Sequence, residues 1–152
     1  MNQTLLVVGA TGIVGGAALK YFSSLAGWEV VALSRRPITP MNNVRYVHAD
    51  LTDFDGCRNA LMNEKNITHI LYAALYEKPN LVAGWSDKDQ MDLNLVMFKN
   101  LVIAVESVAP NLKKYCYQFV FLIWVQKDSI LKIIRFVSPC YFAIFTGFAK
   151  LR

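Results

Sequence analysis

The sequence has few features of a secreted, metal-binding or membrane-spanning protein. Only three of its 152 residues are cysteines, and Cys57, Cys116 and Cys140 form no Cys-x-x-Cys pair. That spacing excludes the usual cysteine zinc and redox motifs, and it favours a reducing compartment. No apolar run reaches the roughly 20 residues that a membrane-spanning helix needs. We therefore expect a cytoplasmic protein with no targeting segment ahead of its first strand.

Acidic residues are also few, and the excess positive charge lies in the last quarter of the chain. The net charge is +5. Residues 1–114 hold 11 Lys and Arg against 10 Asp and Glu, whereas residues 115–152 hold 5 against 1. The first part carries no basic stripe interleaved with aromatic side chains, so no nucleic-acid partner is expected. The length suits one domain that buries roughly two-thirds of its unfolded surface.

An apolar run that ends in regularly spaced glycines opens the chain. Residues 4–8 predict a strand, Gly9, Gly12 and Gly15 follow, and a helical pattern covers 12–24. This order suits a dinucleotide pyrophosphate, because the helix N-terminus offers free N–H groups to an anion. The glycines would serve the tight turn, the approach of the phosphates and helix–strand packing, respectively. A structural turn without a ligand is the alternative. The residues assigned to this cradle are Gly9, Thr11, Gly12, Ile13, Val14 and Gly15.

The segment after the second predicted strand has no acidic residue. Strand 29–33 is followed by Ser34, Arg35 and Arg36, where an Asp or Glu would bind the ribose of NAD. Two guanidinium groups suit a 2′-phosphate instead. Hydrogen bonds to charged groups contribute roughly 1.5–3 kcal/mol each, so two arginines favour NADP by on the order of a hundredfold or more. A solvated basic pair in a loop is the alternative.

The rest of the chain alternates strand and helix patterns. After the loop 37–43 we expect a strand at 44–49, a helix from Thr52 or Asp53 to about residue 63, a strand at 68–75, and a helix from Ser86 or Asp87 to about residue 108. The last helix places Met91, Leu95, Phe98, Val102 and Val105 on one apolar face. Helical crossovers between strands predict an α/β fold with a doubly wound parallel sheet of the Rossmann type.

Two pairs of residues follow predicted strands at the edge where ligands bind in such sheets. Asp50 can accept a hydrogen bond from the adenine amino group while the N–H of Leu51 serves a ring nitrogen. Alternatively, Asp50 only caps the turn. The small side chains of Ala73 and Ala74 leave space for the cofactor or pack tightly against a neighbour. No metal site is expected, because the histidines are separate from one another and from the cysteines.

Together these motifs resemble a known enzyme family. They lie in order at residues 9–15, 34–37, 49–53, 68–72, 94–100 and 109–113. Up to about residue 114, the chain resembles atypical short-chain dehydrogenases/reductases of the progesterone 5β-reductase/iridoid synthase type. That resemblance implies NADPH-dependent reduction of the C=C bond of an enone or enal, with an oxyanion stabilised at the carbonyl. It also implies that Asn94 supports the neighbouring active-site region, and it allows a homodimer.

The family pattern stops near residue 114. The Tyr-x-x-x-Lys pattern of catalytic short-chain dehydrogenases occurs nowhere in the chain. Residues 115–152 contain 10 of the 19 aromatic residues and a single glycine. We interpret 1–114 as an incomplete Rossmann domain and 115–152 as an aberrant apolar tail, such as intron read-through or a shifted frame. The start of the tail, at 115–125, is a substitute fifth strand in one interpretation, and the tail is disordered or an interfacial segment in others.

Two functions stay open at this point. The first is the NADP-binding part of an enone reductase, present as a catalytically incomplete fragment because no catalytic residue is identified. The second is a non-catalytic NADP-binding sensor similar to NmrA-type proteins. Whether the chain is an enzyme therefore depends on its turnover, whereas both functions require the dinucleotide site.

Overall fold

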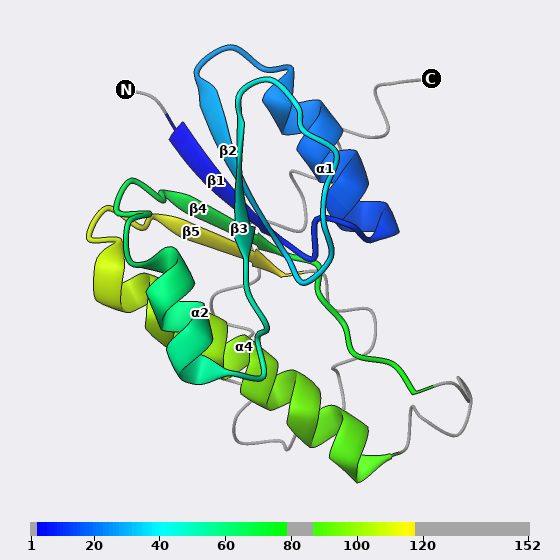
Figure 1. Cartoon of the computed structure of the whole chain (residues 1–152). Helices are drawn as coiled ribbons and strands as arrows, with labels where there is room; N and C mark the ends of the chain where they lie inside the picture. Colours follow the sequence, from blue (N-terminus) through cyan, green and yellow to red (C-terminus); the bar gives the residue numbers. More distant parts are fainter. Residues whose placement is uncertain (1–2, 79–86, 118–152) are drawn as a thin grey trace.

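The computed structural model describes residues 3–78 and 87–117 (Figure 1). Its strands are β1 (Gln3–Val8), β2 (Trp28–Ser34), β3 (Val44–His48), β4 (His69–Tyr72) and β5 (Lys114–Tyr117). Its helices are α1 (Ile13–Ser23), α2 (Phe54–Leu61) and α4 (Lys88–Val108). The strands form one parallel sheet in the order β3-β2-β1-β4-β5. The predicted doubly wound α/β architecture is confirmed.

The helices cover both faces of the sheet. Helix α1 lies on one face, and α2 and α4 lie together on the other (Figure 1). Along β1, Leu5 and Val7 belong to the core under α1, whereas Leu6 and Val8 belong to the core under α2 and α4. A strand that is buried on both faces reads as a continuous apolar run rather than as an alternating one.

The register of the central strands places three loops at one edge of the sheet. Val8, at the end of β1, pairs with Leu33 of β2 and with Tyr72 of β4. The strands therefore end at nearly the same level. The glycine loop lies in the middle, with the segment after β2 on one side and the segment after β4 on the other.

Two helix starts match the capping signals in the sequence. The carboxylate of Asp53 accepts a hydrogen bond from the backbone N–H of Gly56 and caps α2. Asp87 accepts from the N–H groups of Asp89 and Gln90 and caps α4. Of the alternative cap residues, Thr52 lies before α2, and Ser86 lies outside the described residues.

The buried face of α4 differs from the predicted one. Met91, Leu95 and Val102 are only partly buried, and Phe98 and Val105 are the predicted residues that are fully buried. The buried positions are Gln90, Asn94, Met97, Phe98, Leu101, Ala104 and Val105. The prediction was wrong here because it followed apolar side chains alone, whereas Gln90 and Asn94 are buried at the first turns of the helix.

Strand β5 begins at Lys114 and pairs in parallel with β4. It therefore extends across the predicted boundary between residues 114 and 115. The rest of the predicted substitute strand, and the tail as far as residue 152, lie outside the described residues. Among the described helices, none is both long enough and apolar enough to cross a membrane.

Candidate functional site

The glycine loop forms a tight turn that a larger residue would disrupt. Gly9 has φ +81°, and its N–H donates to the carbonyl of Leu33 at 3.1 Å. A Cβ on Gly9 would lie 2.7 Å from the backbone N of Ala74 and 2.8 Å from the carbonyl of Ala73. The two alanines therefore pack directly against the turn. A Cβ on Gly15 would lie 2.2 Å from the carbonyl oxygen of Gly9, so α1 begins in close contact with the loop.

The N-terminus of α1 faces outward from this turn. Gly12 is the N-cap, and no side chain caps the first turn. The first N–H groups of a helix have no intrahelical acceptor, and they carry the positive end of the helix dipole. Ile13 is 94% exposed and Val14 is also exposed. The residues present therefore fit a pyrophosphate, which would meet free N–H groups with no Cβ at Gly12 to obstruct it.

Thr11, Ser34 and Arg36 form a hydrogen-bonded cluster beside the glycine loop. The hydroxyls of Thr11 and Ser34 lie 3.2 Å apart, and the backbone N–H of Arg36 donates to Ser34 Oγ at 3.0 Å. Arg36 Nη2 donates to Thr11 Oγ1 at 3.2 Å. These contacts hold an exposed guanidinium next to two hydroxyls at the carboxyl ends of β1 and β2. Such a group of donors suits a phosphate oxygen.

Arg35 turns toward the loop after β3. Its Nη1 lies 3.8 Å from Asp50 Oδ2, and its carbonyl lies 3.1 Å from His48 Nε2. Asp50 Oδ1 accepts hydrogen bonds from both the backbone N–H and the hydroxyl of Thr52, at 2.9 and 2.8 Å. These two bonds, and more weakly the Arg35 charge, hold the pKa of Asp50 below its usual value. Asp50 therefore closes the turn with one oxygen and faces Arg35 with the other.

The neighbouring residue Leu51 is anchored from the far side of the fold. Its side chain is buried in the core under α2 and α4. Its carbonyl accepts a hydrogen bond from Asn100 Nδ2 of α4 at 2.8 Å. The peptide between Leu51 and Thr52 is thus held at both ends, since its N–H is bound to Asp50.

A second set of amides on α4 holds the loop after β4. Asn94 Oδ1 accepts from the N–H of Tyr76 at 2.8 Å, and Asn94 Nδ2 donates to the Tyr76 carbonyl at 2.9 Å. Gln90 Oε1 accepts from the N–H of Lys78 at 2.8 Å. The ammonium of Lys78 forms an ion pair with Asp87 at 2.5 Å. Asn94 is therefore engaged with protein backbone, at the same edge as the glycine loop.

Sequence reasoning included Asn94 but missed Gln90, Asn100 and Lys78. Gln90 is 6% exposed and Asn94 is 4% exposed, which is unusual for amide side chains. Their spacing of four residues places them on the same side of the helix. The signal that could have revealed Gln90 is that it and Asn94 form a pair of amides on the apolar side of an amphipathic helix.

Two reactive side chains near this edge are buried. Burial raises the pKa of Cys57 to about 11, so its thiolate is scarce near neutral pH. Tyr72 packs edge-on against Phe98, and burial raises the pKa of its phenol well above the usual value. Its hydroxyl finds no hydrogen-bond partner among the residues that the structure describes. Within residues 3–78 and 87–117, no three His, Cys, Asp or Glu side chains are grouped to hold a metal ion.

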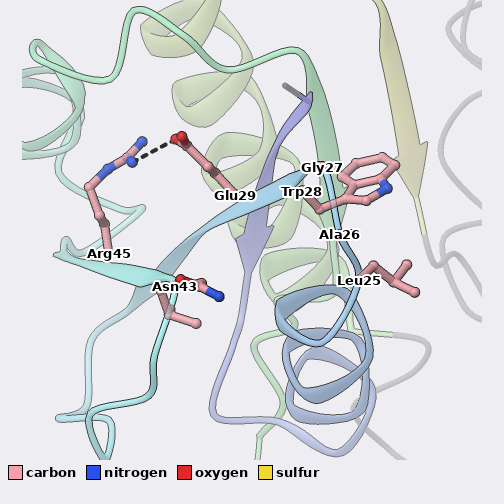
Figure 2. A pocket seen from close by; sticks show the side chains of 8 residues that line it. Leu25, Ala26, Gly27, Trp28, Glu29, Asn43 and Arg45 are labelled. Carbon is pink, nitrogen blue, oxygen red and sulfur yellow. Dashed lines mark hydrogen bonds and ion pairs between the residues drawn. The ribbon is translucent and has the colours of Figure 1, made fainter. Parts of the chain in front are cut away.

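A cavity of about 500 Å³ lies at the opposite edge of the sheet, where β2 and β3 begin. In Figure 2, Glu29 and Arg45 are joined by an ion pair on one side, whereas Leu25 and Trp28 point to the other. The side chains that line this cavity do not converge on one centre. We therefore assign no ligand to this cavity, and the glycine-loop edge is the candidate site.

The chain is similar to curated enzymes from plants over its N-terminal part. It is 34% identical to an (S)-8-oxocitronellyl enol synthase of Antirrhinum majus, with 77% of this chain and 30% of the relative covered. It is 29% identical to a 3-oxo-Delta(4,5)-steroid 5-beta-reductase of Arabidopsis thaliana, again with 77% and 30% covered. The chain thus spans about 30% of the length of these curated relatives.

Solved structures share the fold at lower identity. A short-chain dehydrogenase family protein from Francisella tularensis matches with a TM-score of 0.66 and 17% identity, covering 84% of this chain and 55% of the other. A short-chain dehydrogenase from Burkholderia cenocepacia in complex with NADP matches at 0.58 and 18%, covering 76% and 52%. A point mutant of uronate dehydrogenase from Agrobacterium tumefaciens, complexed with NAD, matches at 0.58 and 20%, covering 77% and 40%.

The family model gives the assignment. Residues 5–122 match the NAD dependent epimerase/dehydratase family, and this match extends from β1 past the end of β5. The glycine loop and the family assignment both indicate a nicotinamide dinucleotide as the cofactor. The chain belongs to the NAD-dependent epimerase/dehydratase family of Rossmann-fold oxidoreductases, and its curated relatives are of the iridoid synthase and steroid 5β-reductase kind.

Proposed function

We propose that this chain binds NADP(H) and is the nucleotide-binding part of an NADPH-dependent reductase of activated C=C bonds. The cluster of Thr11, Ser34 and Arg36 carries the proposal, because it presents donors where NAD-specific sites have an acid. The name of the Arabidopsis thaliana relative, a 3-oxo-Delta(4,5)-steroid 5-beta-reductase, supports a reduction of this kind. When bound, the cofactor would supply a hydride to the enone or enal.

The residues of this chain would bind and orient the cofactor. The N–H groups at the start of α1 would hold the pyrophosphate over Gly12. Arg36, with the hydroxyls of Thr11 and Ser34, would hold the 2′-phosphate, and Arg35 would add a second positive charge. Asp50 and Leu51 would line the adenine, and Ala73 and Ala74 the entry to the nicotinamide side. The cofactor-binding set that we propose is Gly9, Thr11, Gly12, Ile13, Val14, Gly15, Ser34, Arg35, Arg36, Asp50, Leu51, Ala73 and Ala74, and Asn94 would support it through the backbone of Tyr76.

A non-catalytic NADP-binding module is the second candidate. The chain has no Tyr-x-x-x-Lys pattern, and the one tyrosine on β4, Tyr72, is buried in the core. This alternative rests on the missing Tyr-x-x-x-Lys pattern and on the burial of Tyr72. Under this alternative the chain binds NADPH as tightly as a reductase would, without turning over an enone.

Replacing Arg36 tests the proposed phosphate contact. We expect Arg36→Ala to weaken NADP binding by about ten- to a hundredfold, because a hydrogen bond to a charged group contributes roughly 1.5–3 kcal/mol. NAD binding should stay nearly unchanged, since NAD lacks the 2′-phosphate. Isothermal titration of both cofactors against wild type and variant measures the two effects.

Arg58→Ala is the matched control, because Arg58 is an exposed arginine on α2 that lies outside the proposed site. An equal loss of NADP affinity in the Arg36→Ala and Arg58→Ala variants would contradict a specific phosphate contact. Oxidation of NADPH by the wild-type chain in the presence of a simple enone would favour the reductase. Tight binding without oxidation would favour the non-catalytic module.

A further inference from the structure

Helix α4 reaches both loops that flank the glycine turn. At one end, Gln90 and Asn94 bind backbone atoms of Tyr76 and Lys78 in the loop after β4. Ten residues beyond Gln90, Asn100 binds the carbonyl of Leu51 in the loop after β3. A separation of ten residues is about 15 Å along the helix axis. One rigid element therefore holds two separate loops through amide side chains.

The order of the strands places these loops on opposite sides of the proposed pyrophosphate site. The loop after β3 lies on the same side as Arg35 and Arg36, which would hold the adenosine half. The loop after β4 lies across β1, on the side left for the nicotinamide half. Ligands in doubly wound sheets extend across the point where the strand order reverses, which here is between β1 and β4.

Each amide fixes main chain rather than another side chain. Asn94 holds both the N–H and the carbonyl of Tyr76, as a neighbouring strand would. Gln90 holds the N–H of Lys78, two residues after Tyr76. The Leu51–Thr52 peptide is held between Asn100 and Asp50. Loops held in this way keep their backbone groups in place before a ligand arrives, which lowers the entropic cost of binding.

We propose that α4 positions the two halves of the bound dinucleotide separately. Asn100 is a positioning residue for the adenosine half, and Gln90 with Asn94 positions the loop beside the nicotinamide half. None of the three amides needs to touch the cofactor, because each acts through the backbone of a loop. The inference rests on the proposed function, since it concerns the same cofactor.

Two ligands separate the two halves. NADP tests the whole site, and adenosine 2′,5′-bisphosphate tests the adenosine half with its 2′-phosphate. We expect Asn100→Ala to weaken both ligands by about fivefold, the effect of losing one hydrogen bond. We expect Gln90→Met to weaken NADP by a similar factor and to leave adenosine 2′,5′-bisphosphate unchanged. Gln90→Glu keeps an acceptor for the Lys78 N–H and should restore NADP binding.

Control measurements distinguish positioning from a general loss of stability. Asn59→Leu removes an exposed amide on α2 and should change neither affinity. Hydrogen exchange without ligand should show faster exchange of the backbone N–H of Lys78 in Gln90→Met, and no such change in Asn100→Ala or Asn59→Leu. If Asn100→Ala does not fold, Asn100→Asp removes the same donor with little change of shape.

The possible failures are distinct. Binding of neither ligand by the wild-type chain would overturn the proposed function and this inference with it. Normal binding by the wild-type chain, with Gln90→Met losing both ligands equally, would overturn separate positioning and leave the proposed function standing.

Discussion

Arg36 would matter through its placement more than through its charge alone. An exposed arginine in a loop usually contributes little, because ordering its side chain costs entropy. Here the side chain already bonds Thr11, and its backbone N–H bonds Ser34. Part of that entropic cost is therefore met before a phosphate binds. The exposed position keeps the guanidinium open to a ligand.

Asp50 gives a pH-dependent prediction at the scale of a single residue. Its hydrogen bonds from Thr52 lower its pKa in the folded state. A depressed folded pKa contributes stability that is present above the unfolded pKa and lost as pH falls through the folded pKa. We therefore expect the free energy of unfolding to fall between about pH 5 and pH 3. We expect a smaller fall in Asp50→Asn, which cannot titrate.

Urea unfolding of both proteins at the two pH values measures this difference. Asp55→Asn, an exposed acid in the first turn of α2, serves as the control for acid effects that do not involve the Thr52 bonds. An identical fall in wild type and Asp50→Asn would contradict the assignment.

At the scale of elements, the strands were predictable and the buried face of α4 was not. Residues 5–8 and 30–33 are continuous apolar runs, which are typical of a parallel sheet buried on both faces. The glycine turn was equally visible, because its conformation depends on local residues. Gln90, Asn94 and Asn100 are buried or anchored by loops that are distant in sequence. Periodicity treats such amides as polar, so the contacts made by α4 could not be read from its sequence.

The junction of α1 with the glycine loop gives a paired prediction. A Cβ on Gly15 would lie 2.2 Å from the carbonyl oxygen of Gly9, whereas one on Gly16 would lie 3.6 Å from that of Ala10. We expect Gly15→Ala to destabilise the domain by about 1–3 kcal/mol, the usual cost of overpacking. We expect Gly16→Ala to stabilise it by about 0.5–1 kcal/mol, because Ala favours a helix interior.

Chemical denaturation of both variants beside wild type provides the comparison. The two substitutions add the same methyl group at adjacent positions, so differences in composition cannot explain opposite signs. Destabilisation of equal size in both would mean that α1 does not approach the loop as closely as described.

At the scale of the whole molecule, the described residues form a Rossmann fold with the candidate dinucleotide site at one edge of its sheet. The five strands and three helices bring together the glycine turn, the basic loop and the loops held by α4. The chain spans about 30% of the length of its curated relatives. Binding of a dinucleotide is the property that this part can be tested for directly.

Thermal unfolding of the chain with NADP, with NAD and without ligand tests the central claim most directly. A ligand at 100 times its dissociation constant stabilises the folded state by about 2.7 kcal/mol, which raises the midpoint of a domain of this size by several degrees. We predict a clear rise with NADP and a smaller one with NAD at the same concentration. Equal shifts with both cofactors would contradict the phosphate site at Arg36, and a cooperative transition that neither cofactor moves would contradict dinucleotide binding by this chain.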